Sequence, residues 1–501
     1  MNNISYRQLE DRFRRLSALA DAEAMLHWDL ATMMPRGGAE ARAEQLATLK
    51  ALRHGLLTAS EVADWLAAAD GELLDDWQRA NVREMGRIHA HAVALDEAQV
   101  EALSRATSAC ESVWREARAE SDFARVLPSL RTLLGLVREV AAAKAERLKL
   151  APYDALLDEF EPDGRAAAID ELFADLAAFL GPFLAAVVER RASRPAPVAA
   201  AGPFAIEDQR RIAVRLMQAL GFDFDHGRLD VSLHPFCGGT PDDVRITTRY
   251  DEADYRSALM GVMHETGHAL YQRNLPITWR GQPVGDARGM VLHESQSLLI
   301  EMQLCRSRPF LAFAAPLLRD VLGGNKATPA DAAWDADNLY RHYTRVEPGL
   351  IRVEADEVTY PLHVILRYQL ERSMLAGDLD PGDLPEAWND GMTRLIGLRP
   401  PDDRLGCLQD IHWYDGAWGY FPTYTLGAMA AAQIFEAACV ADGSIVDGIA
   451  RGDFAPLLSW LARSVHGQGS RYSSRELLLR ATGSPLSSAA FKAHLQRRYL
   501  D

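Results

Sequence analysis

The sequence has few of the features that mark secreted or disulfide-linked proteins. It contains only five cysteines in 501 residues, and no two of them form a CxxC pair. A disulfide framework or a zinc finger needs an even and closely spaced set, so we expect five free thiols. They are Cys110, Cys237, Cys305, Cys407 and Cys439.

The sequence also lacks the segments that would direct it to a membrane or to nucleic acid. No uninterrupted apolar run reaches about 18 residues, and residues 1–15 lack the apolar core of a signal peptide. Lysine and arginine number 54 against 70 aspartates and glutamates, which gives a formal charge of -16. Because such a surface repels phosphate backbones and anionic lipid, we predict a cytoplasmic protein without nucleic-acid or membrane partners.

Aromatic residues are scarce at 8%, whereas hydrophobic residues reach 48%. Alanine, leucine, glutamate and arginine are abundant, and apolar residues recur with helical spacing through residues 6–191. Ser473-x-x-Glu476 is a capping box that indicates a helix start near the end of the chain. We predict a mainly α-helical single fold over residues 1–501, with a surface loop or a subdomain boundary near residues 194–203.

One segment departs from the helical pattern. Residues 243–250 alternate, with Val244 and Ile246 on the apolar side, which predicts a half-buried strand at the edge of a small sheet. A helix should follow from Asp251, a plausible N-cap, to Gln272. An exposed edge strand here could pair with an extended peptide through main-chain hydrogen bonds.

This helix carries the motif His264-Glu265-Thr266-Gly267-His268. Residues four apart project from one helix face, so His264 and His268 can reach the same zinc ion. Glu265, next to the first ligand, can take a proton from a water that zinc activates. Chance would produce HExxH in roughly a few per cent of such chains, so the motif and its helical context favour a zinc peptidase.

A catalytic zinc needs a third protein ligand and an open position. Glu294 is the best candidate, since it lies in a second apolar helical segment that could cross the first at the metal. Spacing alone leaves His293 and Glu301 as alternatives.

Further motifs extend through the chain and resemble the carboxypeptidase Taq family of metallocarboxypeptidases. They are Trp28-Asp29, Met34-Pro35, His234-Pro235-Phe236, Asp243-x-Arg245-x-Thr247, His293-Glu294-Ser295-Gln296-Ser297, Ile351-Arg352-x-x-Ala355-Asp356, Gly406-x-x-Gln409-Asp410-x-His412-Trp413 and Gly419-Tyr420-Phe421-Pro422-Thr423-Tyr424. The resemblance implies a helical fold with a deep active-site groove and a small sheet beside the zinc helix. It also implies Glu294 as third ligand, a homodimer, peptide substrates, and removal of C-terminal residues with broad specificity.

The resemblance extends to residues that contact substrate. His412 and Tyr424 are expected to donate hydrogen bonds to the tetrahedral intermediate, with Tyr420 as a rival of Tyr424. Arg352 is the first choice for the substrate carboxylate, although its spacing from Asp356 is also that of an ordinary helical ion pair. A further candidate for the cleft is Arg245, on the predicted strand.

One position departs from the family pattern, and the function leaves alternatives. Leu298 stands where the family usually has arginine after His-Glu-Ser-Gln-Ser. Cobalt or manganese could replace zinc, because His₂Glu sites accept several divalent ions. The rival functions are a zinc oligopeptidase or aminopeptidase, and a catalytically silent peptide-binding homologue. Retention of Glu265 argues against the silent homologue, since a structural zinc needs no base.

Overall fold

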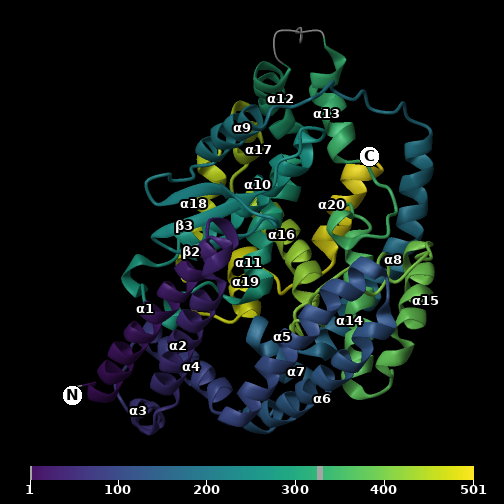
Figure 1. The fold of residues 1–501 in the computed structure, drawn as a ribbon. Helices are drawn as coiled ribbons and strands as arrows, with labels where there is room; N and C mark the ends of the chain where they lie inside the picture. Colours follow the sequence, from purple (N-terminus) through teal and green to yellow (C-terminus); the bar gives the residue numbers. More distant parts are fainter. Residues whose placement is uncertain (1–2, 324–330) are drawn as a thin grey trace.

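The structure is a computed structural model that describes residues 3–323 and 331–501. These residues are mostly helical, as the composition predicts, with one small sheet near the middle of the chain (Figure 1). Residues 194–203 contain no helix or strand. Nine α-helices of the described residues precede the sheet: α1 (Ile4–Thr32), α2 (Ala39–Thr58), α3 (Ser60–Ala69), α4 (Asp76–Ala92), α5 (Glu97–Glu120), α6 (Phe123–Leu148), α7 (Pro152–Phe160), α8 (Ala166–Ala192) and α9 (Ile206–Ala219).

The sheet consists of β1 (Gly227–Val231), β2 (Cys237–Thr240) and β3 (Asp243–Thr248) in the order β1-β3-β2. The predicted strand is confirmed as β3, but its predicted place at the edge is wrong. β3 is central, parallel to β1 and antiparallel to β2. The outer strand β2 has the sequence Cys-Gly-Gly-Thr, which indicates a turn because glycine is depleted in strands.

Helices resume after the sheet. They are α10 (Tyr255–Arg273), α11 (Gly289–Leu298), α12 (Arg308–Leu322), α13 (Ala336–Tyr343), α14 (Tyr360–Ala376), α15 (Leu384–Ile396), α16 (Pro422–Ala441), α17 (Ile445–Arg451), α18 (Ala455–Ser464), α19 (Ser474–Thr482) and α20 (Ala489–Tyr499). α11 continues into the π-helical segment η4 (Leu299–Cys305).

The helix starts test two capping predictions. Ser473 caps α19 by accepting a hydrogen bond from the Glu476 N–H, as predicted. The return bond of a capping box is not formed among the described residues, and the Glu476 carboxylate pairs with Arg480. The predicted cap Asp251 is wrong, because its carboxylate accepts from the Ala253 N–H in a preceding turn and Asp254 caps α10 instead. All five cysteines are free, which confirms that prediction.

Two helices, α8 and α16, are long and apolar enough by length and composition to cross a membrane, although the sequence contains no long uninterrupted apolar run. Buried core helices meet the same criterion. α16 packs against α11, α14, α19 and α20, and 56% of its apolar window is buried. α8 buries one face in the main hydrophobic cluster through side chains such as Ile169, Phe173 and Leu180.

The centre of the fold is the crossing of α10, α11 and α16 (Figure 1). α10 and α11 approach so closely at Gly267 that an added Cβ would lie 2.4 Å from the Gln296 carbonyl oxygen and 2.6 Å from the Ser297 Cα. α16 approaches α11 in the same way at Gly427, where a Cβ would lie 2.8 Å from the side chain of Glu294. Glycine at these two positions sets the separation of the three helices.

We therefore expect Gly267→Ala to lower the free energy of unfolding by about 1–3 kcal/mol, because the backbone of α11 must move to admit the methyl group. Gly261→Ala on the same helix is the matched control. Its Cβ would meet only Pro235, at 3.9 Å, so the better helix propensity of alanine should leave stability equal or higher. Urea unfolding curves measure both, and equal midpoints for the two variants would contradict the close crossing.

Candidate metal centre and surrounding residues

The three predicted metal ligands meet where α10 crosses α11. His264 and His268 project from one face of α10, and Glu294 faces them from α11. Their ligand atoms all lie within 4.8 Å of one another. The Glu294 carboxylate is 3.6 Å from His268 Nε2 and 4.0 Å from His264 Nε2. The sequence-predicted group is thus brought together.

The two alternative ligands lie elsewhere. A Glu301 oxygen is 3.0 Å from His264 Nδ1, the nitrogen that points away from Glu294, and Glu301 also pairs with Arg306. His293 directs its Nε2 toward Gln272, at 2.9 Å. Glu301 therefore occupies the place of a carboxylate that orients a ligating histidine and fixes its tautomer.

The charges around the histidines favour a bound cation. Burial disfavours a charged imidazole at His264, but the carboxylates of Glu301, Glu294 and Glu265 outweigh it and raise the pKa of the ring to about 10. Burial and two neighbouring histidines hold the pKa of His268 well below its usual value, so this ring is neutral with a lone pair to donate. The donor set and the excess of carboxylates fit a divalent metal ion.

Glu265 occupies the position expected of a catalytic base. It follows the first histidine on α10, is buried, and lies next to the Cys237 main chain of β2, which lowers the pKa of its carboxyl slightly. Burial raises the pKa of its carboxyl to about 7, and Glu294 and Glu301 add to the rise against the opposing effect of His264. A carboxyl group with such a pKa can both accept and release a proton near neutral pH.

The predicted His412, Tyr420 and Tyr424 form one cluster. His412 Nε2 is 3.2 Å from the Tyr424 hydroxyl, and the rings of Tyr420 and Tyr424 are 5.1 Å apart. Burial lowers the pKa of His412 to about 4, so its imidazole is neutral. Burial raises the pKa of Tyr424 to about 12, and the nearby Glu294 carboxylate contributes to this rise, so the hydroxyl keeps its proton.

Arg352 lies beside this cluster, with its guanidinium 5.0 Å from the Tyr424 ring. The alternative prediction, that Arg352 forms an ordinary helical ion pair with Asp356, is wrong. Arg352 begins a short 3₁₀ segment and pairs with Asp410. Its Nε and Nη2 donate to that carboxylate, and its Nη1 donates to the Tyr360 hydroxyl at 3.2 Å. Two of the five N–H groups of an arginine remain available for another acceptor.

Sequence reasoning missed the residues that hold Arg352 in place. Asp410 also accepts from Arg367 Nε at 2.5 Å, and the Gln409 side chain accepts from the Arg352 main-chain N–H at 2.9 Å. The two arginines keep the pKa of Asp410 far below its usual range despite burial. The only signal in the sequence was an acidic residue within the motif that contains His412.

Arg245 stands apart from these contacts. It pairs with Asp243 on the same strand and lies over the Trp28 ring, with 5.8 Å between guanidinium and ring centroid. The strand and helix α1 therefore hold Arg245 by local contacts, and no contact among the described residues joins it to Arg352.

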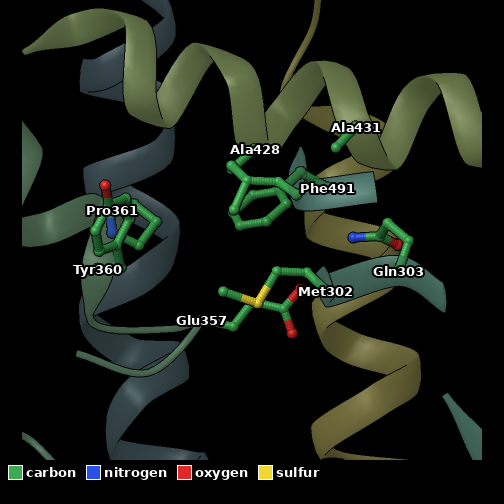
Figure 2. A pocket seen from close by; sticks show the side chains of 9 residues that line it. Met302, Gln303, Glu357, Tyr360, Pro361, Ala428, Ala431 and Phe491 are labelled. Atoms are coloured by element: carbon green, nitrogen blue, oxygen red, sulfur yellow. The ribbon is translucent and has the colours of Figure 1, made fainter. Parts of the chain in front are cut away.

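Leu298 borders a small cavity that is also lined by Tyr360, the partner of Arg352. The cavity has a volume of about 20 Å³. Figure 2 shows Met302, Tyr360, Glu357 and Phe491, which line it. Glu357 is buried, and its charge is balanced by Arg498 of α20 at 2.9 Å. Leucine therefore stands beside this cavity where the resemblance leads one to expect arginine, and a cation from α20 neutralises Glu357.

The comparisons with known proteins cover nearly the whole chain. A family model described as Carboxypeptidase Taq (M32) metallopeptidase matches residues 8–499. Thermostable carboxypeptidase 1 of Thermus thermophilus is 39% identical over 511 residues, which cover 99% of this chain and 98% of that protein. Carboxypeptidase 1 of Bacillus subtilis is 34% identical over 494 residues, which cover 98% of this chain and 97% of that protein.

Solved structures agree with this assignment. Metallocarboxypeptidase 1 of Trypanosoma cruzi matches 100% of both chains with a TM-score of 0.97 and 39% identity. The M32 carboxypeptidase of Deinococcus radiodurans matches 99% of both chains with a TM-score of 0.93 and 36% identity. The predicted family and fold are confirmed. This chain therefore belongs to the carboxypeptidase Taq (M32) family and is a metallocarboxypeptidase.

Proposed function

We propose that this metallocarboxypeptidase hydrolyses the last peptide bond of peptides with broad specificity, and that one Zn²⁺ is held by His264, His268 and Glu294. The observation that supports the proposal is the convergence of these three side chains within 4.8 Å, with Glu265 next to the first of them. When bound, the cation would supply Lewis-acid chemistry to a carbonyl group and to a water molecule.

Glu265 is the general base of the proposed reaction. Its carboxylate accepts a proton as water attacks the scissile carbonyl, and it then passes that proton to the departing amine. The Cys237 main chain lies on one side of the carboxylate. The same orientation can therefore serve both proton transfers.

Tyr424 is the proposed donor to the oxyanion that forms during attack. Its hydroxyl keeps its proton near neutral pH, and neutral His412 contacts it at 3.2 Å and limits its rotation. Tyr420 remains the rival donor because its ring packs against Tyr424.

Arg352 is the proposed partner of the free carboxylate at the end of the substrate. Asp410 orients its guanidinium through two nitrogens, which leaves N–H groups for a second carboxylate. The substrate main chain is proposed to pair with β2, the outer strand beside Glu265, in place of the central strand β3. Homodimer formation and a cytoplasmic location stay predictions of the sequence.

Mass spectrometry of a peptide ladder tests the end specificity and the metal requirement together. We expect an N-terminally acetylated peptide to lose residues from its C-terminal end, and a chelator to stop the reaction until zinc is restored. An aminopeptidase could not shorten the acetylated peptide. Trimming that continues in full after the metal has been removed would exclude the proposed mechanism.

Glu265→Gln separates catalysis from metal binding. We expect kcat to fall by about 10²–10⁴-fold because the base is lost, while zinc content stays at the parent level. Glu294→Gln is the companion variant and should lose zinc as well as activity, because the amide is a poorer ligand. Elemental analysis and initial rates measure both effects, and normal turnover of Glu265→Gln would refute the assignment.

Arg352→Lys tests recognition of the substrate carboxylate. Loss of the planar fork should reduce kcat/KM by about 10–100-fold on a peptide with a free C-terminal carboxylate, given the usual strength of hydrogen bonds to charged groups. Arg245→Lys is the control and should change kcat/KM by no more than about threefold, since its ion pair with Asp243 is partly exposed. Thermal unfolding confirms that each variant is folded, and equal effects of the two substitutions would argue against Arg352.

A further inference from the structure

A second cluster of charged side chains lies where α8, α13 and α20 converge, near the chain end marked C in Figure 1. None of the proposed catalytic or metal-binding residues lines it. Six arginines surround a cavity of about 260 Å³, which we call the arginine pocket. They are Arg190, Arg191, Arg194, Arg341, Arg345 and Arg498.

Three of these arginines have a carboxylate partner. Glu347 lies 2.7 Å from Arg345 and 3.7 Å from Arg191, and its side chain is 60% exposed. Glu357 lies 2.9 Å from Arg498 and is buried. Two side-chain carboxylates therefore pair with three of the six guanidinium groups.

The other three arginines have no side-chain carboxylate partner among the residues that the structure describes. Arg341 donates to the amide oxygen of Asn338 at 3.3 Å, and Arg190 Nη2 donates to a main-chain oxygen of Asp501 at 3.1 Å. The Nε of Arg190 is buried without a hydrogen-bond partner in the described part of the chain. A buried donor of this kind needs an acceptor, and the cavity beside it has room for one.

The chemistry of the pocket selects its ligand. Arginine forks bind phosphate and carboxylate oxygens in pairs, and several forks around one cavity require several such groups. The chain has a formal charge of -16, so the rest of its surface would repel a long polyanion. A small molecule contacts the pocket alone. The cavity volume is close to the lower limit of small-molecule sites, about 300 Å³. We propose that the arginine pocket binds a small polyanion with two or more phosphate or carboxylate groups.

Isothermal titration calorimetry of the metal-loaded enzyme tests this, with inorganic pyrophosphate and the tricarboxylate tricarballylate as separate probes. We expect saturable binding of at least one probe with a Kd below about 1 mM. The double substitution Arg194→Gln/Arg341→Gln should weaken it by at least about tenfold. Neither residue has an ion pair within the described ranges, so the variant should fold normally, which its unfolding midpoint checks.

The matched control is Arg105→Gln/Arg115→Gln on α5, which removes the same charge from side chains that are 71% and 69% exposed. It should bind like the parent. Pyrophosphate also chelates divalent cations, which produces heat in every sample. Binding to the pocket is therefore measured as the heat that the parent and the control variant give and the pocket variant does not.

The probe that binds identifies the ligand class: pyrophosphate alone indicates a phosphate-bearing ligand, and tricarballylate alone a polycarboxylate. Three results would overturn the proposal. They are no saturable binding of either probe up to about 10 mM, binding that survives in the pocket variant, and equal weakening in the control.

Discussion

The close contact between α10 and α11 at Gly267 is the constraint on which the metal centre depends. The two histidines lie one helical turn apart on α10, and Gly267 between them lets the main chain of α11 approach. Glu294 comes within 3.6 Å of His268 because the two backbones nearly touch. A larger residue at this point would move the third ligand away, whatever the side-chain rotamers.

Around this contact the protein buries several charged groups, among them Glu294, Glu301, Arg352 and Arg367. Burying an isolated charge is costly, and two networks of ion pairs reduce that cost here. Glu301 joins His264 to Arg306, and Asp410 joins Arg352 to Arg367. These pairs are weak arguments for stability, but they fix the direction of the side chains that face the substrate.

The sequence predicts the parts of the site that depend on local geometry. HExxH places His264 and His268 on one face of any α-helix, so their common direction follows from spacing alone. The choice of Glu294 over His293 and Glu301 depends on how two helices cross, which spacing does not specify. The same limit applies to Arg352, whose partner Asp410 is 58 residues away along the chain.

The incorrect predictions also have physical causes. The low strand propensity of Cys-Gly-Gly-Thr conceals the neighbour of β3, because main-chain pairing with β3 makes that segment β2 and places β3 at the centre of the sheet. Asp251 and Asp254 are both suitable caps, and the turn between them decides which one begins α10. Homology information in the motifs was needed to predict His412 and Tyr424, because neither residue has a spacing that marks it.

The second glycine contact has a consequence for protein engineering. Gly427 contributes no functional group, yet it leaves the volume that the Glu294 side chain occupies. A search or a graft that copies only the three ligands onto another helical scaffold would omit both glycines. The transplanted residues would have the right chemistry without the space to converge, so the two empty Cβ positions belong to the definition of the site.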